Sequence, residues 1–447
     1  MKHLALIFIC SIAIIFIQCK SSQNNIGSQL NKKITTILPS STVIIAPTFK
    51  KNFNNDNTCP ERKLGGNAIT KDGYLVFEGA TDGNRQVDPQ IAVGGNYILH
   101  GTNSGLIVYD KEGKYLSGVT QKCFKNGIDP KLFYDMHNKV FGFDLWEYWD
   151  SAKIKPVHVS ISSSSNPLGS WNTYSVPAPK GVDGGAISFS KKWIGYSFPG
   201  GDENTFVLKM ADAKAGRPAK VYYFKGSLGH PVAVQDNIDA LYFFDIDNKN
   251  YVIKKIVSDK NGDAICEEVS RKAHNMKNFD WPPQSPQKGT TQLTSSGDRN
   301  PKNVVLQDGF IWFSHTVNIN GRAGVQWHQL ELNGTVVQEG EISSPTSSYI
   351  QTTLAVNKNK DVLIGFQETS TAMYISPRMT FRKNTDAPGS TRPIISLGEG
   401  KGATDGVAWG DYSGSIVDGD NLLDLWTVQS ITTAKGKGEL RIAKIPL

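Results

Sequence analysis

The segment Asp88-Pro89-Gln90-Ile91-Ala92-Val93, followed closely by Asn96-Tyr97-Ile98, decides the fold because its pattern recurs along the chain. In this pattern a polar residue, often followed by Pro or Gly, precedes a strand of small apolar residues, and a turn then leads to an aromatic strand. Equivalent segments begin at Asp129, Asp183, His230, Asn300, Tyr349 and Asp411. Successive segments start 41 to 70 residues apart, a spacing typical of propeller blades with four strands each.

We therefore predict an all-β chain with a single β-propeller over residues 65–447 and seven blades of four-stranded antiparallel sheets. Six or eight blades remain alternatives. The small-apolar strand of each repeat is expected to be the innermost one, because the crowded axis favours small side chains. One short helix is predicted at Met210–Ala219, and an insertion at Asn275–Arg299 accounts for the longest gap between repeats.

Composition excludes several classes of protein. The 447 residues are 39% hydrophobic and 20% charged, which argues against a disordered chain, and no long heptad run predicts a coiled coil. The net charge of +7 is spread without a basic cluster, so we expect no nucleic-acid partner. We expect a monomer.

The first residues have the pattern of an export signal. Met1-Lys2-His3 precedes an uncharged apolar run, Leu4 to Ile17, that is too short for a membrane-spanning helix. Cys19 follows at once, so the leader resembles that of bacterial lipoproteins. The resemblance implies a signal peptide at 1–18, diacylation of Cys19 and an outer-membrane or cell-surface address. An ordinary cleaved signal peptide, with a periplasmic or secreted product, is the alternative. Residues 19–64 are predicted to be a flexible tether.

Three cysteines remain in the predicted mature body, namely Cys59, Cys123 and Cys266. One disulfide among them is possible in an exported protein, and buried free thiols are the alternative. No CxxC pair occurs, so a zinc ribbon is not expected.

The body resembles secreted bacterial propeller proteins with a sialidase-like fold, most of which have no assigned function. The matching segments are Asp129 to Tyr134, Asn166 to Tyr174, Gly321 to Glu331, Ala355 to Phe366, Thr385 to Pro388, Gly398 to Gly400 and Trp409 to Ser413. True sialidases carry Asp-boxes, with the motif S-x-D-x-G-x-T-W. Ser163 to Trp171 matches this motif only in part, and the sialidase arginine triad is not recognisable. Sialidase activity is therefore not implied.

The polar residues that begin the seven inner strands are expected to converge on one mouth of the central channel. The ring consists of Asp88, Asp129, Asp183, His230, Asn300, Tyr349 and Asp411, with Arg85, Arg299 and Tyr412 beside it. Paired aspartates would suit a glycoside hydrolase, whose two carboxylates lie about 5 to 10 Å apart. His230, Tyr349 or Tyr412 as a base, with Arg299 to neutralise a uronate, would suit a polysaccharide lyase. The alternative is structural, since Asp or Asn before Pro or Gly caps turns.

Two functions follow from this pattern. The first is a lipid-anchored propeller that binds an extracellular or periplasmic glycan or surface component. The second is a glycan-degrading enzyme whose candidate catalytic residues are Asp88, Asp129, Asp183, His230, Arg299, Tyr349 and Asp411. The candidate ligand contacts are Arg85, Asn300, Tyr412, Trp146 and Trp149. The two tryptophans form a dense aromatic loop, for which packing between blades is the alternative.

We expect no cofactor and no metal site. His315 and His328 flank a predicted hairpin, but a cross-strand histidine pair held by hydrogen bonds is commoner than a metal site. The stretch Asp245-Ile246-Asp247-Asn248 offers oxygen ligands for Ca²⁺ but lacks the spacing of a calcium loop.

Overall fold

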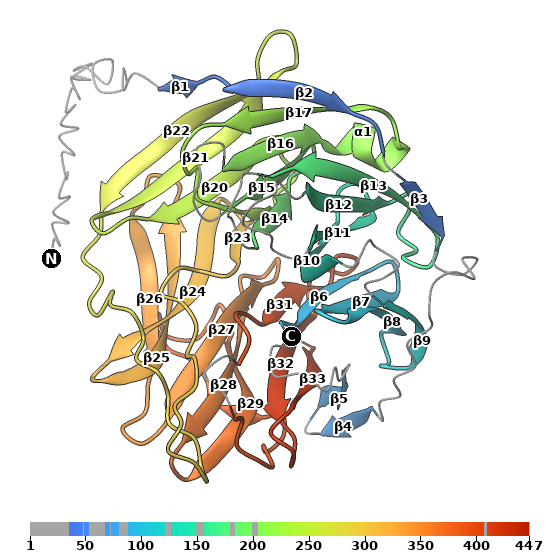
Figure 1. The fold of residues 1–447 in the computed structure, drawn as a ribbon. Coiled ribbons are helices and arrows are strands. Elements are labelled where there is room, and N and C mark those ends of the chain that lie inside the picture. Colours follow the sequence, from blue (N-terminus) through green and yellow to red (C-terminus); the bar gives the residue numbers. More distant parts are fainter. Residues whose placement is uncertain are drawn as a thin grey trace, which may run out of the picture. The chain divides into compact units, whose positions relative to one another are not determined.

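Seven sheets form a closed ring in the computed structural model, which confirms the all-β, seven-bladed propeller (Figure 1). The structure describes residues 35–47, 49–52, 68–71, 73–79, 88–120, 127–147, 156–178, 184–198, 204–405 and 409–446. The inner strands contact one another in sequence order around the axis, and the last one returns to the first. All pairings are antiparallel except that of β19 with β23.

The blades follow one another along the chain. Blade 1 contains β6 (Gln90–Gly94), β7 (Tyr97–Thr102), β8 (Gly105–Asp110) and β9 (Tyr115–Thr120). Blade 2 contains β10 (Gly127–Asp135), β11 (Val140–Glu147), β12 (Pro156–Ser162) and β13 (Ser170–Pro177). Blade 3 contains β14 (Ala186–Phe189), β15 (Trp193–Ser197), β16 (Thr205–Lys209) and β17 (Ala219–Phe224). Blade 4 contains β18 (His230–Pro231), β20 (Leu241–Ile246), β21 (Asn250–Ser258) and β22 (Ala264–Ala273).

The second half of the ring is built in the same way. Blade 5 contains β19 (Ala233–Val234), β23 (Val304–Gln307), β24 (Phe310–Ile319), β25 (Arg322–Glu331) and β26 (Val336–Ile342). Blade 6 contains β27 (Ser348–Val356), β28 (Val362–Ser370), β29 (Met373–Arg382) and β30 (Ile395–Ser396). Blade 7 contains β31 (Gly414–Val417), β32 (Leu425–Thr432), β33 (Gly438–Ile445), β5 (Tyr74–Glu78) and β4 (Ile69–Lys71).

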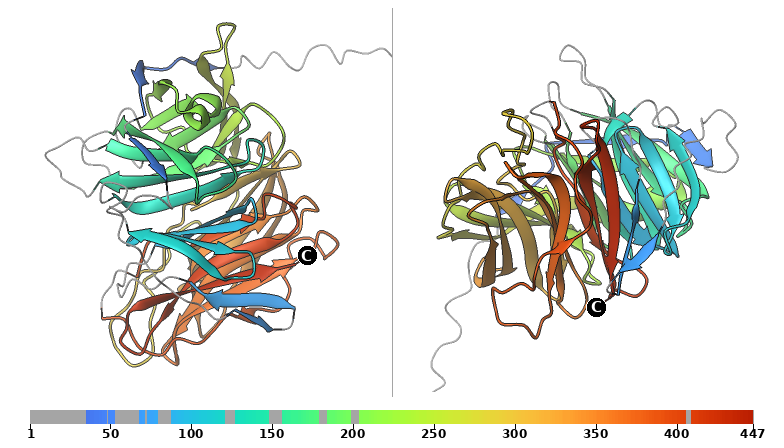
Figure 2. Two further views of the ribbon diagram at one scale, coloured as in Figure 1. Left: turned by 90° about the vertical axis from the view of Figure 1, so that its right-hand side faces the viewer. Right: turned by 90° about the horizontal axis from the view of Figure 1, so that it is seen from below.

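Three N-terminal strands lie on the outer edges of blades 4, 3 and 2 (Figures 1 and 2). They are β1 (Thr36–Ile37) beside β22, β2 (Ser41–Ile45) beside β17, and β3 (Phe49–Asn52) beside β13. The sequence predicted a flexible tether at 19–64, but these three segments of it are paired strands. Each covers backbone groups that an exposed sheet edge would leave unpaired.

Helix α1 (Met210–Ala215) is the short helix that the sequence predicted, and it ends earlier than Ala219. Gly216 adopts a left-handed conformation with φ of 64°, and its N–H donates to Ala213 O. This is a common helix C-cap, and it stops the helix before Pro218. Within the described ranges, no helix has the length and apolar character needed to cross a membrane.

The hydrophobic cores lie between neighbouring blades. Buried aromatic and aliphatic side chains of adjacent sheets interlock there, as where Phe244 of blade 4 packs against Phe313 of blade 5 with ring centroids 4.8 Å apart. The inner strands approach one another so closely that a Cβ atom added to Gly94 would lie 2.2 Å from the Tyr134 ring of blade 2. This crowding explains why small residues recur in the inner strands.

Ring closure depends on β5, because the N-terminal strands β5 and β4 complete the sheet of the C-terminal strands (Figure 2). Phe77 of β5 pairs with Ile442 of β33 and packs edge-on against Tyr109 of blade 1, with ring centroids 5.3 Å apart. Phe77 is therefore the link between the two ends of the chain and the first blade.

We expect Phe77→Ala to lower the free energy of unfolding by roughly 3 to 5 kcal/mol, because it opens a cavity in a closed interface. Urea unfolding followed by tryptophan fluorescence measures the change. The control is Leu116→Ala on β9, whose side chain is 37% exposed, and its effect should stay within about 0.5 kcal/mol. Equal effects of the two variants would contradict the importance of closure at this residue.

Candidate functional site

A cavity of about 340 Å³ opens at the mouth where the inner strands begin. Five residues of the predicted ring or its neighbours line it, namely Asp129, His230, Asn300, Asp411 and Tyr412. A smaller, mostly apolar cavity of about 70 Å³ shares Lys131, His230 and Lys302 with it and continues into the channel. The sequence pattern thus placed residues from blades 2, 4, 5 and 7 around one concave site.

Left-handed backbone at the starts of several inner strands turns the chain into the channel. Asp88 and Asp129 have φ of 43° and 55°, although each precedes a proline. Residues other than glycine rarely adopt this conformation, which costs of the order of 1 to 3 kcal/mol. Asn103 bridges the two turns, since its amide nitrogen donates to Asp88 Oδ2 at 2.7 Å and its oxygen accepts from the Asp129 N–H at 2.9 Å.

Asp88 lies just beneath the mouth and is buried. Its Oδ1 accepts the backbone N–H of Asp411 at 2.6 Å. Burial, followed by the negative charge of Asp411, raises the pKa of Asp88 to about 7. With both oxygens in hydrogen bonds, Asp88 ties blades 1 and 7 together and does not line the cavity.

Lys131 is the central cation of the site. Its ammonium lies 3.1 Å from the centroid of the Tyr412 ring, a close cation–π contact. Burial lowers the pKa of Lys131, while the carboxylates of Asp129, Asp144 and Asp88 act in the opposite direction. The backbone N–H of Lys131 donates to Asp144 Oδ1 at 3.0 Å, and burial raises the pKa of Asp144 to about 7.

His230 is held by the backbone on both sides. Nδ1 lies 2.8 Å from Pro231 O, and Nε2 lies 3.1 Å from Lys302 O. Burial lowers the pKa of His230 to about 4, so the ring is neutral at pH 7. A neutral imidazole carries a single N–H, so the ring donates to one of these carbonyl oxygens, while its unprotonated nitrogen faces the other carbonyl and not the cavity.

Four charged residues of the cavity were absent from the predicted ring: Lys131, Lys302, Asp245 and Asp298. Lys302 forms an ion pair with Asp298 at 3.2 Å, and burial raises the pKa of Asp245. The two lysines had a signal in the sequence, because both end a polar-Pro-Lys triplet, Asp129-Pro130-Lys131 and Asn300-Pro301-Lys302. The aspartates had none, since they lie outside the repeated segment.

Three predicted site residues lie elsewhere. Trp146 is buried and its indole N–H donates to the Tyr196 hydroxyl at 2.9 Å, so it packs between blades 2 and 3 and forms no exposed platform. Tyr349 is buried against Phe366 in blade 6. Arg299 does not line the cavity, because its guanidinium turns to Phe279 and Trp281 of the insertion. Asp183, Arg85, Trp149, Cys19, Cys59 and Cys123 lie outside the described residues.

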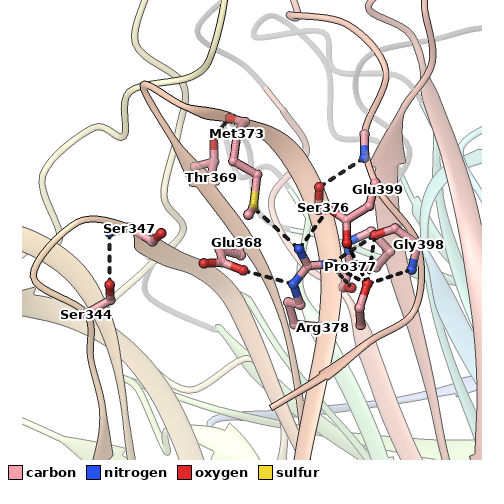
Figure 3. A network of polar contacts seen from close by, with 12 residues as sticks. Ser344, Ser347, Glu368, Thr369, Met373, Ser376, Pro377, Arg378, Gly398 and Glu399 are labelled. Carbon is pink, nitrogen blue, oxygen red and sulfur yellow. Dashed lines mark hydrogen bonds and ion pairs between the residues drawn. The ribbon is translucent and has the colours of Figure 1, made fainter.

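Arg378 near Tyr349 forms the densest polar network of blade 6 (Figure 3). Its Nε donates to Glu368 at 2.8 Å and its Nη2 to Glu399 at 3.0 Å. Its Nη1 donates to the Ser396 hydroxyl and to the carbonyls of Pro377 and Gly398. All three nitrogens are occupied, so this cluster holds the loop after β30 and leaves the guanidinium no capacity for a ligand.

Within the described part of the chain, no group of three or more His, Cys, Asp or Glu residues is placed to hold a metal ion. His315 and His328 do meet, with their Nε2 atoms 3.3 Å apart. Asp247 accepts the N–H groups of Lys249 and Asn250 in its own turn, and it pairs with Arg271. Cys266 is buried, and burial raises the pKa of its thiol to about 12.

No family model matches the chain, and no curated protein sequence matches it. Among solved structures, a chain of Kuenenia stuttgartiensis hydrazine synthase is similar over 86% of this chain and 99% of that chain, at 10% identity and a TM-score of 0.46. Trypanosoma rangeli sialidase is similar over 92% of this chain and 59% of that chain, at 12% identity and a TM-score of 0.33. An α-L-arabinofuranosidase from Fusarium graminearum is similar over 93% of this chain and 98% of that chain, at 9% identity and a TM-score of 0.32. At these values the likenesses carry no argument about function.

The raised pKa of Asp144 predicts a specific pH dependence of stability. A carboxyl whose pKa is higher in the folded than in the unfolded chain binds its proton more tightly when folded. It therefore stabilises the fold in acid, and this contribution is lost as the pH rises from about 4 to about 7. We expect the stability of wild type relative to Asp144→Asn to fall by a few kcal/mol over that range.

Urea unfolding at several pH values between 4 and 8 measures this difference. The matched control is Glu112→Gln, which exchanges the same groups at an exposed residue and should follow wild type in parallel. A constant difference between wild type and Asp144→Asn at all pH values would contradict the assignment.

Proposed function

We propose that the protein is an exported, lipid-anchored propeller whose mouth cavity binds a sugar unit of an extracellular or periplasmic glycan. The observation that carries the proposal is the cavity itself, a concave site of about 340 Å³ at the lower end of the usual range for small ligands. Carboxylates, ammonium groups and amides line it beside the apolar side chains of Phe198 and Phe244. A sugar offers both hydroxyl groups for the polar side and C–H faces for the rings.

Asp411 and Asn300 are the groups best placed to meet a ligand. Both line the cavity and both are exposed. Among described residues, no hydrogen bond occupies the Asp411 carboxylate, while its backbone N–H is held by Asp88. A carboxylate fixed at its backbone and open at its oxygens can accept a bidentate pair of sugar hydroxyls.

Binding is favoured over lyase chemistry because the candidate bases His230 and Tyr412 already have partners, as does the buried Asp88. His230 faces two carbonyls, Asp88 accepts two hydrogen bonds, and the Tyr412 hydroxyl donates to Pro130 O at 3.2 Å. Burial raises the pKa of Tyr412 well above its usual range, so it is no base near neutrality. A hydrolase or lyase remains the alternative, and the experiment below distinguishes it.

The experiment compares wild type with Asp411→Ala. Binding is screened on a panel of immobilised glycans, and the affinity for a glycan that binds is then measured by calorimetry. We expect wild type to bind and the variant to lose affinity roughly 10- to 100-fold, the effect of a lost hydrogen bond to a charged group. Asp280→Ala, an exposed aspartate of the insertion outside the cavity, is the control and should bind like wild type.

Assays for new reducing ends and for unsaturated products at 235 nm run on the same panel with wild type, Asp411→Ala and His230→Ala. No turnover is expected. Turnover by wild type that Asp411→Ala abolishes without unfolding would replace binding by catalysis. Absence of any bound glycan would contradict the proposal.

The proposed membrane anchor rests on Cys19 directly after the apolar leader. Labelling of cells with palmitate should mark wild type and should be lost in Cys19→Ala, whereas Cys10→Ala inside the leader should remain labelled. Recovery of unlabelled wild type in the aqueous phase of a detergent extraction would contradict the lipid anchor. The cavity proposal does not depend on this result.

A further inference from the structure

Trp281 is exposed to an extent that sets it apart from the other tryptophans of the described chain. Its side chain is 56% exposed. The others that the structure describes are buried: Trp146, Trp171, Trp193, Trp312, Trp327, Trp409 and Trp426. An exposed indole that is held in place keeps a large aromatic face open to a ligand.

The surrounding residues hold the indole in place. The guanidinium of Arg299 lies 5.3 Å from the Trp281 ring centroid and 4.7 Å from that of Phe279. Arg299 is fixed in turn by hydrogen bonds of 3.2 Å to Phe279 O and to Asn248 Oδ1. Before the indole, Asp280 O accepts the N–H of Asn318, and after it the sequence continues with Pro282-Pro283. The backbone on both sides is therefore restrained.

The segment of Arg299, which contacts Trp281, and the segment of Asn248, which fixes Arg299, both contribute to the wall of the mouth cavity. Arg299 lies between Asp298 and Asn300, which line the cavity. Asn248 follows Asp245 and Ile246, which line it as well. Asp298 and Asn300 line the cavity, while the guanidinium of Arg299 between them lies over the rings of Phe279 and Trp281. Trp281 thus stands one chain segment beyond the rim.

We infer that Trp281 is a second sugar-binding position, continuous with the mouth cavity, and that the ligand is an oligosaccharide of several units and not a free monosaccharide. The inference rests on the proposed function. A pyranose presents C–H bonds on its faces and hydroxyls on its edge, so its face stacks on the electron-rich face of an indole. One sugar unit of the oligosaccharide occupies the polar cavity, and a later unit of the same oligosaccharide lies on Trp281.

The test compares Trp281→Ala and Trp281→Phe with wild type by calorimetry. The probes are the monomer, trimer and hexamer of N-acetylglucosamine, glucose (β-1,4), mannose and galacturonic acid. We expect wild type to bind the hexamer of one series more tightly than its monomer. Trp281→Ala should weaken hexamer binding at least roughly fivefold and leave monomer binding unchanged, and Trp281→Phe should retain most of the affinity because a ring remains.

Leu293→Ala is the matched control, since Leu293 is a 43% exposed apolar residue of the same insertion. It should bind every probe like wild type. Acrylamide quenching gives a second readout that does not depend on affinity. The hexamer should protect a fluorescence component that is absent from Trp281→Phe, and the monomer should not protect it.

Equal affinities of wild type and Trp281→Ala for the hexamer would overturn the inference and leave the proposed function standing, provided that Asp411→Ala still weakens binding. A parallel loss for monomer and hexamer would overturn it too, because the residue would then support the cavity itself. If no probe binds to wild type, both the proposed function and this inference fail.

Discussion

Closure of the ring is the constraint on which the rest of the structure depends. Each blade buries its faces only against its two neighbours, so a blade at an open end would expose aromatic surface on one side. The chain meets this demand by pairing β33 with β5, which places residues from both ends of the propeller in one sheet. Phe77 then contacts blade 1 through Tyr109, and the last inner strand, β31, contacts the first, β6.

The cavity at the mouth is a consequence of the same closure. Because the inner strands are arranged around one axis, residues separated by hundreds of positions, such as Asp129 and Asp411, line a single concavity. The same geometry brings several carboxylates near one another, which is unfavourable unless cations or hydrogen bonds compensate. Lys131 supplies the cation. The pKa values of Asp88 and Asp144 are raised chiefly by burial, and at Asp88 also by the charge of Asp411.

The repeat in the sequence was sufficient to predict the inner strands, and five of the polar residues at or beside their starts line one cavity. Polar-Pro or polar-Gly before a small-apolar run is a local signal, and local signals report turns and crowding directly. The edge strands at Thr36–Ile37, Ser41–Ile45 and Phe49–Asn52 could not be predicted in the same way, because their partners lie far along the chain. Trp146 shows another limit. A tryptophan suits a sugar platform and a blade interface equally well, and only its burial and its bond to Tyr196 decide between them.

Two charged clusters of the molecule show what separates a structural network from a binding site. Arg378 has every nitrogen occupied by side chains or carbonyls of its own blade, so no ligand can gain a hydrogen bond there without breaking one. At the mouth, the backbone is held by Asp88 and Asn103, while the Asp411 carboxylate and Asn300 stay exposed. The strained backbone at Asp88 and Asp129 also indicates rigidity at the mouth, because a left-handed residue before proline persists only where the surroundings enforce it. Groups that are rigid at their base and open at their ends lose little entropy when a ligand arrives, and for this reason we propose a binding site at the mouth and not in blade 6.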